Sequence, residues 1–310
     1  MNKKLITIIG FVALLVIIIV FVIYTPKPKI VEIESSTENI ATTTTNQMIV
    51  ATTTIDVLDY QIELVREVFD DSAPFGSRVS ILRDGEYLFT SVEGLEYLTF
   101  YYDETIPFLK TSADLKKAVK DITGNGIPEL YIRGWSGGSH CCYHNYIIEL
   151  SNPLSILFDV DTEDFKISFE DLDKDGIMEI LTNESKFSYW HTYYVASPRP
   201  PVILSLQEGK YKADPVFMRK PAPTDMEIRE LANDVKGWSG DGSVGPTVAW
   251  EYAVDLIYSG NIESARKYVD LAWRDDKSGD FKTKDIFWEE LSSQIKESPY
   301  YNDLEDFFGL

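Results

Sequence analysis

The chain has 310 residues, of which 44% are hydrophobic and 13% aromatic, and it carries a formal net charge of −21 at pH 7. This composition excludes a wholly disordered chain and a protein with many membrane spans. The negative charge argues against nucleic acid as a partner. The length allows one large or two modest domains, and the two adjacent cysteines rule out a framework of spaced disulfides.

The first residues predict a membrane anchor. An uncharged run from Leu5 to Tyr24 follows two lysines, and as a helix it would rise ~30 Å, the thickness of a bilayer core. The run has no small-residue cleavage site, so an uncleaved helix is favoured over a cleaved signal peptide or a buried globular helix. We therefore predict that residues 1–29 form a single-pass anchor in the cell membrane, with the bulk of the protein extracytoplasmic.

Residues 30–54 are predicted to be a disordered spacer. This segment is polar and contains unbroken threonine runs at residues 42–45 and 52–54. It has too little apolar area to offset the entropy lost on ordering. A stalk carrying O-linked sugars is the alternative.

Two related acidic segments lie fifty residues apart, Asp121–Glu129 and Asp171–Glu179. Each has oxygen-bearing side chains at positions 1, 3, 5 and 9 and glycine at position 6. Calcium takes about six to eight oxygen ligands, which such a loop can supply together with a backbone carbonyl at position 7. The predicted ligands are Asp171, Asp173, Asp175, Ile177 (carbonyl) and Glu179 in a main site, and Asp121, Thr123, Asn125, Ile127 (carbonyl) and Glu129 in a weaker one.

These segments differ from an EF-hand, which needs an acidic ligand at position 12, where they have Ile132 and Thr182. Each loop instead runs into a strand-like sequence. The pattern resembles the calcium loop of integrin-type repeats, the FG-GAP and VCBS group, in which Asp-x-Asp-x-Asp-Gly-x-x-Asp joins two strands. The resemblance implies bound calcium, although two repeats are too few for a propeller. The alternative is a pair of hydrogen-bonded turns without metal.

The remaining pattern predicts an α+β fold, with the N-terminal transmembrane helix, a mostly antiparallel β domain (55–220) that carries the integrin-type calcium loops, and a C-terminal helical subdomain (221–310). Further strands are expected at 79–82, 87–90 and 98–102, with a turn at Asp84-Gly85. A capping box at Thr224–Glu227 opens a helix that ends at Gly237. Helices at 248–259 and 262–273 form a hairpin similar to a single tetratricopeptide unit, and a last helix covers 283–297.

The histidines and cysteines suggest a second possible metal site. The candidates are His140, Cys141, Cys142, His144 and His191. Adjacent residues in a strand point to opposite faces, so both cysteines reach one ion only at a local bend. A vicinal disulfide and two packed thiols are favoured over zinc or copper. The segment from Gly137 to Cys142, with Tyr189–Thr192, also resembles an uncharacterised family of bacterial secreted or anchored proteins. No activity is known for that family, so the resemblance implies none here.

Together these features predict a membrane-anchored binding or adhesion module, not an enzyme, with calcium in a structural role. Its ligand, a protein or a glycan, would contact Tyr189, Trp190 and Trp135, unless these aromatics are core residues. The alternatives are a cell-envelope metal-dependent hydrolase that uses a site near His140 and His191, and a purely structural envelope protein. No nucleophile elbow, zincin helix or phosphate-binding glycine loop supports an enzyme.

Overall fold

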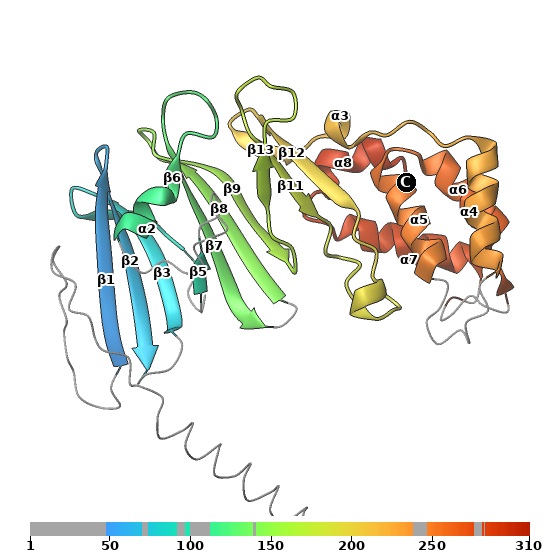
Figure 1. The fold of residues 1–310 in the computed structure, drawn as a ribbon, viewed down its shortest axis with the longest axis horizontal. Coiled ribbons are helices and arrows are strands. Elements are labelled where there is room, and N and C mark those ends of the chain that lie inside the picture. The colour runs from blue at the N-terminus through green and yellow to red at the C-terminus, as the bar shows by residue number, and fades with distance from the viewer. Residues whose placement is uncertain are drawn as a thin grey trace, which may run out of the picture. The chain divides into compact units, whose positions relative to one another are not determined.

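A computed structural model describes residues 48–69, 74–91, 97–99, 112–138, 141–237, 247–275, 281 and 283–310 (Figure 1). These residues belong to one compact unit. Antiparallel sheets come first and helices follow, which confirms the α+β class. The predicted anchor and most of the predicted spacer lie outside the described residues. Among the residues that are described, no helix is long and apolar enough to cross a membrane.

The first sheet has the strand order β1-β2-β3-β4. Its strands are β1 (Met48–Val57), β2 (Tyr60–Phe69), β3 (Pro74–Arg83) and β4 (Glu86–Thr90). The turn predicted at Asp84-Gly85 joins β3 to β4, and both of its residues have positive φ. β1 contradicts the prediction of a disordered spacer for residues 48–54. Thr52, Thr53 and Thr54 pair with β2 along a continuous register, where β-branched side chains suit a pleated surface.

The second and third sheets carry the acidic segments. The second contains β5 (Tyr97–Thr99), β6 (Val119–Lys120), β7 (Glu129–Gly138), β8 (Cys141–Glu149) and β9 (Ser155–Glu163), and helix α2 (Ser112–Lys117) precedes β6. The third contains β10 (Ser168–Glu170), β11 (Glu179–Asn183), β12 (Pro201–Gln207) and β13 (Lys210–Ala213). Of the strands expected upstream, β5 joins the second sheet, whereas β3 and β4 belong to the separate first sheet.

The helices follow β13. They are α3 (Pro215–Met218), α4 (Asp225–Gly237), α5 (Thr247–Tyr258), α6 (Ile262–Ala272), α7 (Lys284–Lys296) and α8 (Tyr301–Phe308). The predicted capping box is confirmed, because the Thr224 nitrogen donates to Glu227 Oε2 at 2.7 Å and the Glu227 nitrogen donates to Thr224 Oγ1 at 3.3 Å. The short helices α2, α3 and α8 were not predicted.

The second sheet is buried on both faces, and this arrangement produces two cores. Side chains alternate along β7, so Leu130 and Ile132 pack with the first sheet while Tyr131 points to the opposite face. Tyr131 belongs to the larger core, which also includes residues of the third sheet and of helices α3 to α8. The predicted β and helical regions therefore share one hydrophobic core.

A buried carboxylate links the third sheet to the helices. Glu184 follows β11 and is fully buried. It accepts hydrogen bonds from the backbone nitrogens of Ser185 and Lys186, each at 3.0 Å, and from the Tyr258 hydroxyl of α5 at 2.9 Å. The Ser298 hydroxyl, just after α7, is a further donor. Burial, followed by the charge of Glu184, holds the pKa of Tyr258 well above its usual range, so this tyrosine remains a donor.

Candidate metal centre

Each acidic segment connects two antiparallel strands, as its sequence predicted. The first joins β6 to β7, and the second joins β10 to β11. Positions 4 and 6 have positive φ in both loops: 69° and 83° at Gly124 and Gly126, and 67° and 93° at Lys174 and Gly176. The two loops therefore share positive φ at the same two positions, and glycine at position 6 is explained by its freedom to adopt this conformation.

The two loops lie side by side at the upper edge of the view in Figure 1. The backbone nitrogen of Met178, at the end of the second loop, donates a 2.9 Å hydrogen bond to the carbonyl oxygen of Ile122 in the first. The Met178 carbonyl in turn accepts a 2.9 Å hydrogen bond from the Tyr211 hydroxyl of β13. These bonds fix the loops to each other and to the third sheet.

The second loop brings three predicted ligands together. One carboxylate oxygen from each of Asp171, Asp173 and Glu179 can be chosen so that all three lie within 4.8 Å of one another. Within the described part of the chain, no other group of histidine, cysteine, aspartate or glutamate side chains converges in this way. Asp175 is not part of the group: its Oδ1 accepts a 2.8 Å hydrogen bond from the backbone nitrogen of Ile177.

Glu179 is the buried member of this triad. Its Oε2 accepts a 2.8 Å hydrogen bond from the Leu172 nitrogen, which closes the loop across its ends. Burial raises the pKa of Glu179, and the charges of Asp173 and Asp175 raise it further, against the opposing effect of the Leu172 hydrogen bond. Without a cation, the loop therefore disfavours the ionised carboxylate that cation binding would need.

In the first loop the equivalent glutamate, Glu129, accepts two hydrogen bonds from its own loop. Glu129 is fully buried and accepts hydrogen bonds from the Ile122 nitrogen to Oε2 and from the Thr123 hydroxyl to Oε1, both at 2.8 Å. Asn125 donates through Nδ2 to Glu149 at 2.6 Å. Burial raises the pKa of Glu129, with smaller contributions from the charges of Asp121 and Glu149, while the two hydrogen bonds lower it.

Position 3 distinguishes the two loops chemically. In the first loop it is Thr123, whose hydroxyl donates to Glu129. In the second it is Asp173, a carboxylate whose charge helps to raise the pKa of Glu179. The Thr123 hydroxyl therefore stabilises the carboxylate of Glu129 in the first loop. In the second loop, Asp171, Asp173 and Glu179 lie close together instead.

The histidine and cysteine candidates do not form a cluster in the described residues. Nε2 of His144 contacts Asp159 Oδ1 at 2.7 Å, and Nε2 of His191 contacts Glu290 Oε2 at 2.9 Å. Cys142 is disulfide-bonded, which favours the vicinal disulfide because the chain has one other cysteine. His140 lies outside the described residues.

The three aromatic candidates have different surroundings. Tyr189 is 57% exposed. Trp190 packs into the larger core, with its ring centroid 5.5 Å from that of Phe281. Trp135 is half-buried and stacks on Tyr143 at 6.3 Å. Two further residues of the same loop, Tyr193 and Val195, are exposed but were not predicted as candidates, although residues 187–198 stand out as a stretch without Asp, Glu, Lys or Arg.

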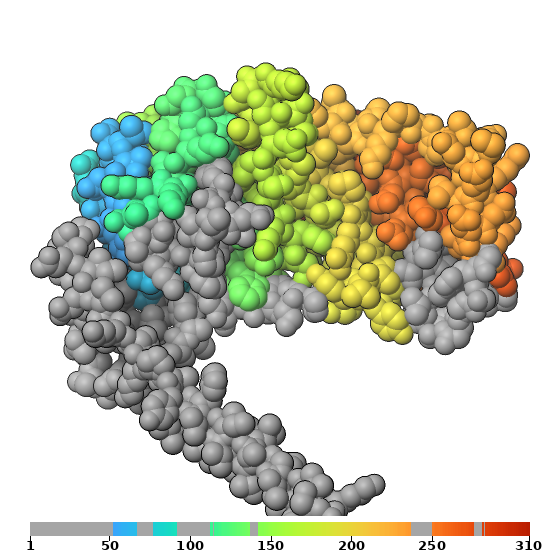
Figure 2. Space-filling model, viewed as in Figure 1, coloured from blue at the N-terminus to red at the C-terminus, as the bar shows by residue number. Residues whose placement is uncertain are grey.

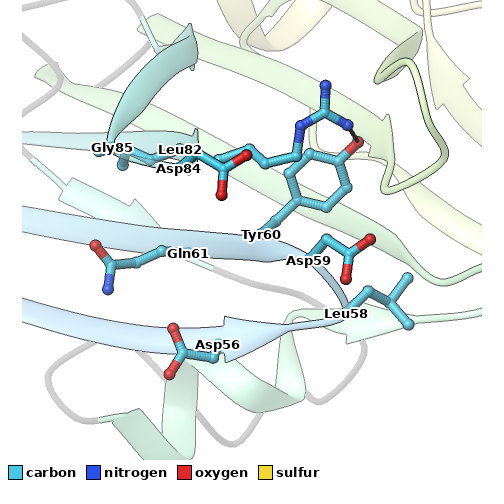
Figure 3. A pocket seen from close by; sticks show the side chains of 9 residues that line it. Asp56, Leu58, Asp59, Tyr60, Gln61, Leu82, Asp84 and Gly85 are labelled. Atoms are coloured by element: carbon cyan, nitrogen blue, oxygen red, sulfur yellow. Dashed lines mark hydrogen bonds between the residues drawn. The ribbon is translucent and has the colours of Figure 1, made fainter.

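A shallow depression of about 300 Å³ lies between the β1–β2 and β3–β4 turns of the first sheet (Figure 3). Asp56, Asp59 and Asp84 line it, but their carboxylates do not converge in Figure 3. Arg83 donates to Asn152 Oδ1 at 2.7 Å and to the Tyr60 hydroxyl at 3.5 Å. None of the predicted calcium ligands lines this depression.

In comparisons with known proteins, no family model, no curated protein and no solved structure matches this chain.

Proposed function

We propose that this protein is a membrane-anchored, extracytoplasmic binding or adhesion module whose β region is stiffened by calcium in the second acidic loop. The observation that carries the calcium proposal is the convergence of Asp171, Asp173 and Glu179 to within 4.8 Å. Carboxylate oxygens are the ligands that calcium prefers, and one glycine-containing turn supplies all three. The anchor is the run from Leu5 to Tyr24.

A structural role for calcium fits the position of the loop. The second loop connects β10 to β11, and its last residue before β11 is hydrogen-bonded to the first loop. Three crowded carboxylates repel one another when no cation is present. A bound cation would remove that repulsion and hold this β-hairpin against its neighbour, which would leave ligand recognition to another surface.

The test is a melting curve of the full-length protein in calcium and in chelator. A ligand that binds only the folded state stabilises it by RT ln(1 + [L]/Kd), or ~2.7 kcal/mol at a hundredfold excess over Kd. Calcium should therefore raise the melting temperature. Asp173→Asn should abolish most of the rise, while Asn125→Ala in the first loop, which removes a neutral ligand of the weaker site, should leave most of it. Identical wild-type curves in calcium and chelator would refute the calcium proposal.

A further inference from the structure

The connection from β11 to β12 contains a surface segment that the calcium proposal does not use. We call residues 187–198 the aromatic loop; it includes the short 3-10 helix Tyr194–Ala196. The loop lacks Asp, Glu, Lys and Arg in a chain of which 25% is charged. Tyr193 is 54% exposed and Val195 86% exposed, and Tyr189 lies on the same loop. In Figure 2 this part of the chain forms the yellow surface at the lower edge.

Hydrogen bonds hold the backbone of the aromatic loop in place. The Ser197 hydroxyl accepts a 2.9 Å hydrogen bond from the Tyr189 nitrogen and donates one of 3.0 Å to the Tyr193 carbonyl. Arg199 donates to the Tyr194 carbonyl at 2.9 Å, and its guanidinium lies over the Tyr194 ring at 4.4 Å. Because the loop is fixed before any ligand arrives, binding would cost little conformational entropy.

Two residues of the loop have a strained backbone conformation. Tyr189 and His191 have φ values of 60° and 50°, a conformation that costs a non-glycine residue roughly 1–2 kcal/mol. Between them, Trp190 packs into the core, and the His191 ring lies 4.5 Å from that of Phe281. The strained backbone turns Trp190 inward and leaves Tyr189 exposed, and such strain is concentrated at functional sites.

Four charged side chains beside the loop each contact an opposite charge, a hydroxyl or an aromatic ring, although the buried atoms Asp164 Oδ1 and Arg199 Nε have no hydrogen-bond partner among the described residues. The matched pairs are Lys186 with Glu163, His191 with Glu290, Asp164 with Ser188, and Arg199 with Tyr194. An uncharged partner is therefore the best electrostatic complement to this surface.

We propose that the aromatic loop binds an uncharged oligosaccharide whose sugar rings stack on the exposed tyrosines Tyr189 and Tyr193. Sugar rings present C–H faces to aromatic rings and hydroxyls to tyrosine hydroxyls, and a tyrosine offers both contacts. The rings of Tyr189 and Tyr194 already lie next to each other, with centroids 5.4 Å apart. The inference rests on the proposed binding function and specifies its ligand class.

The experiment is isothermal titration of the full-length protein, in a detergent without sugar, with the tetrasaccharides of glucose, N-acetylglucosamine and mannose. We expect at least one to bind. Tyr189→Ala and Tyr193→Ala should each weaken binding about tenfold, the loss of one stacking contact. Tyr189→Phe keeps the ring and should retain most of the affinity. Tyr87→Ala is the matched control, since Tyr87 is a 60% exposed tyrosine on β4, and it should change nothing.

Two results would overturn this proposal: no tetrasaccharide binds, or binding is unchanged in both alanine variants. Melting curves of the variants check that each one folds. The calcium test on the same samples is independent, because the aromatic loop contains none of the proposed calcium ligands. A calcium shift without sugar binding refutes only the oligosaccharide proposal, and sugar binding without a calcium shift refutes only the calcium proposal.

Discussion

The carbonyl oxygen of Gly176 lies so close to Gly124 that a β-carbon added at residue 124 would come within 3.0 Å of it. The contact joins position 6 of the second acidic loop to position 4 of the first. It explains why the first loop has glycine at position 4, whereas the second loop has Lys174 there with the same positive φ. The two loops are therefore similar in backbone but not interchangeable in packing.

Gly124→Ala should destabilise the protein more than Gly126→Ala. Both residues have positive φ, so either alanine adds roughly 1 kcal/mol of backbone strain. Only at Gly124 does the new β-carbon also meet the Gly176 carbonyl, and such overpacking costs about 1–3 kcal/mol more. Urea unfolding in chelator measures the two losses without calcium. Equal losses would mean that the loops can move apart at no cost.

Glu179→Gln should have opposite effects in chelator and in calcium. The pKa of Glu179 is raised in the folded protein, so without a cation its ionisation destabilises the fold as the pH rises above the ordinary glutamate pKa, and this cost shrinks as the pH falls from the raised pKa toward the ordinary one. Glutamine removes the charge but can still accept from the Leu172 nitrogen. The variant should melt higher than wild type in chelator at neutral pH and lower in saturating calcium.

Acidification should also reduce the calcium-dependent rise in melting temperature, because protons compete for the Glu179 carboxylate at a higher pH than for an ordinary glutamate. Melting curves across a pH series in calcium and in chelator measure this effect. A Glu179→Gln protein that melts below wild type under both conditions would contradict the electrostatic explanation.

Glu184→Ala should be among the most destabilising single changes. It leaves the hydroxyls of Tyr258 and Ser298 and two backbone N–H groups without their acceptor, and each unsatisfied group costs about 1–3 kcal/mol. Tyr258→Phe removes one of these bonds and should lose about 1–2 kcal/mol. Glu208→Ala is the surface control and should leave the free energy of unfolding nearly unchanged. Chemical denaturation of the three variants ranks these losses.

The N-terminal run predicts that the intact protein stays with membranes. Leu5–Tyr24 is long enough to span a bilayer and lacks a cleavage site. Protease added to intact cells should release the folded part, and the N-terminal segment should remain in the membrane fraction. Recovery of a secreted protein that begins near Thr25 would show that the run is a cleaved signal.

Much of the fold and part of the candidate site could be predicted because the deciding contacts are local. The capping box at Thr224 and Glu227 is made by residues three apart, and the turn at Asp84-Gly85 needs only its own backbone. The acidic loops are equally local: the strand-like residues that follow each loop predicted a strand there, and the second loop brings Asp171, Asp173 and Glu179 together.

The tertiary structure decided the features that depend on contacts between distant segments. Pairing with β2 draws Thr52–Thr54 into a strand, although their composition predicts disorder. Packing against the helical core turns Trp190 inward, whereas Tyr189 beside it stays exposed. The pairing of the two loops through Met178 and Ile122 joins residues more than fifty positions apart. Such contacts form only when the chain closes long loops, and their energies depend on which side chains meet, which local sequence patterns do not encode.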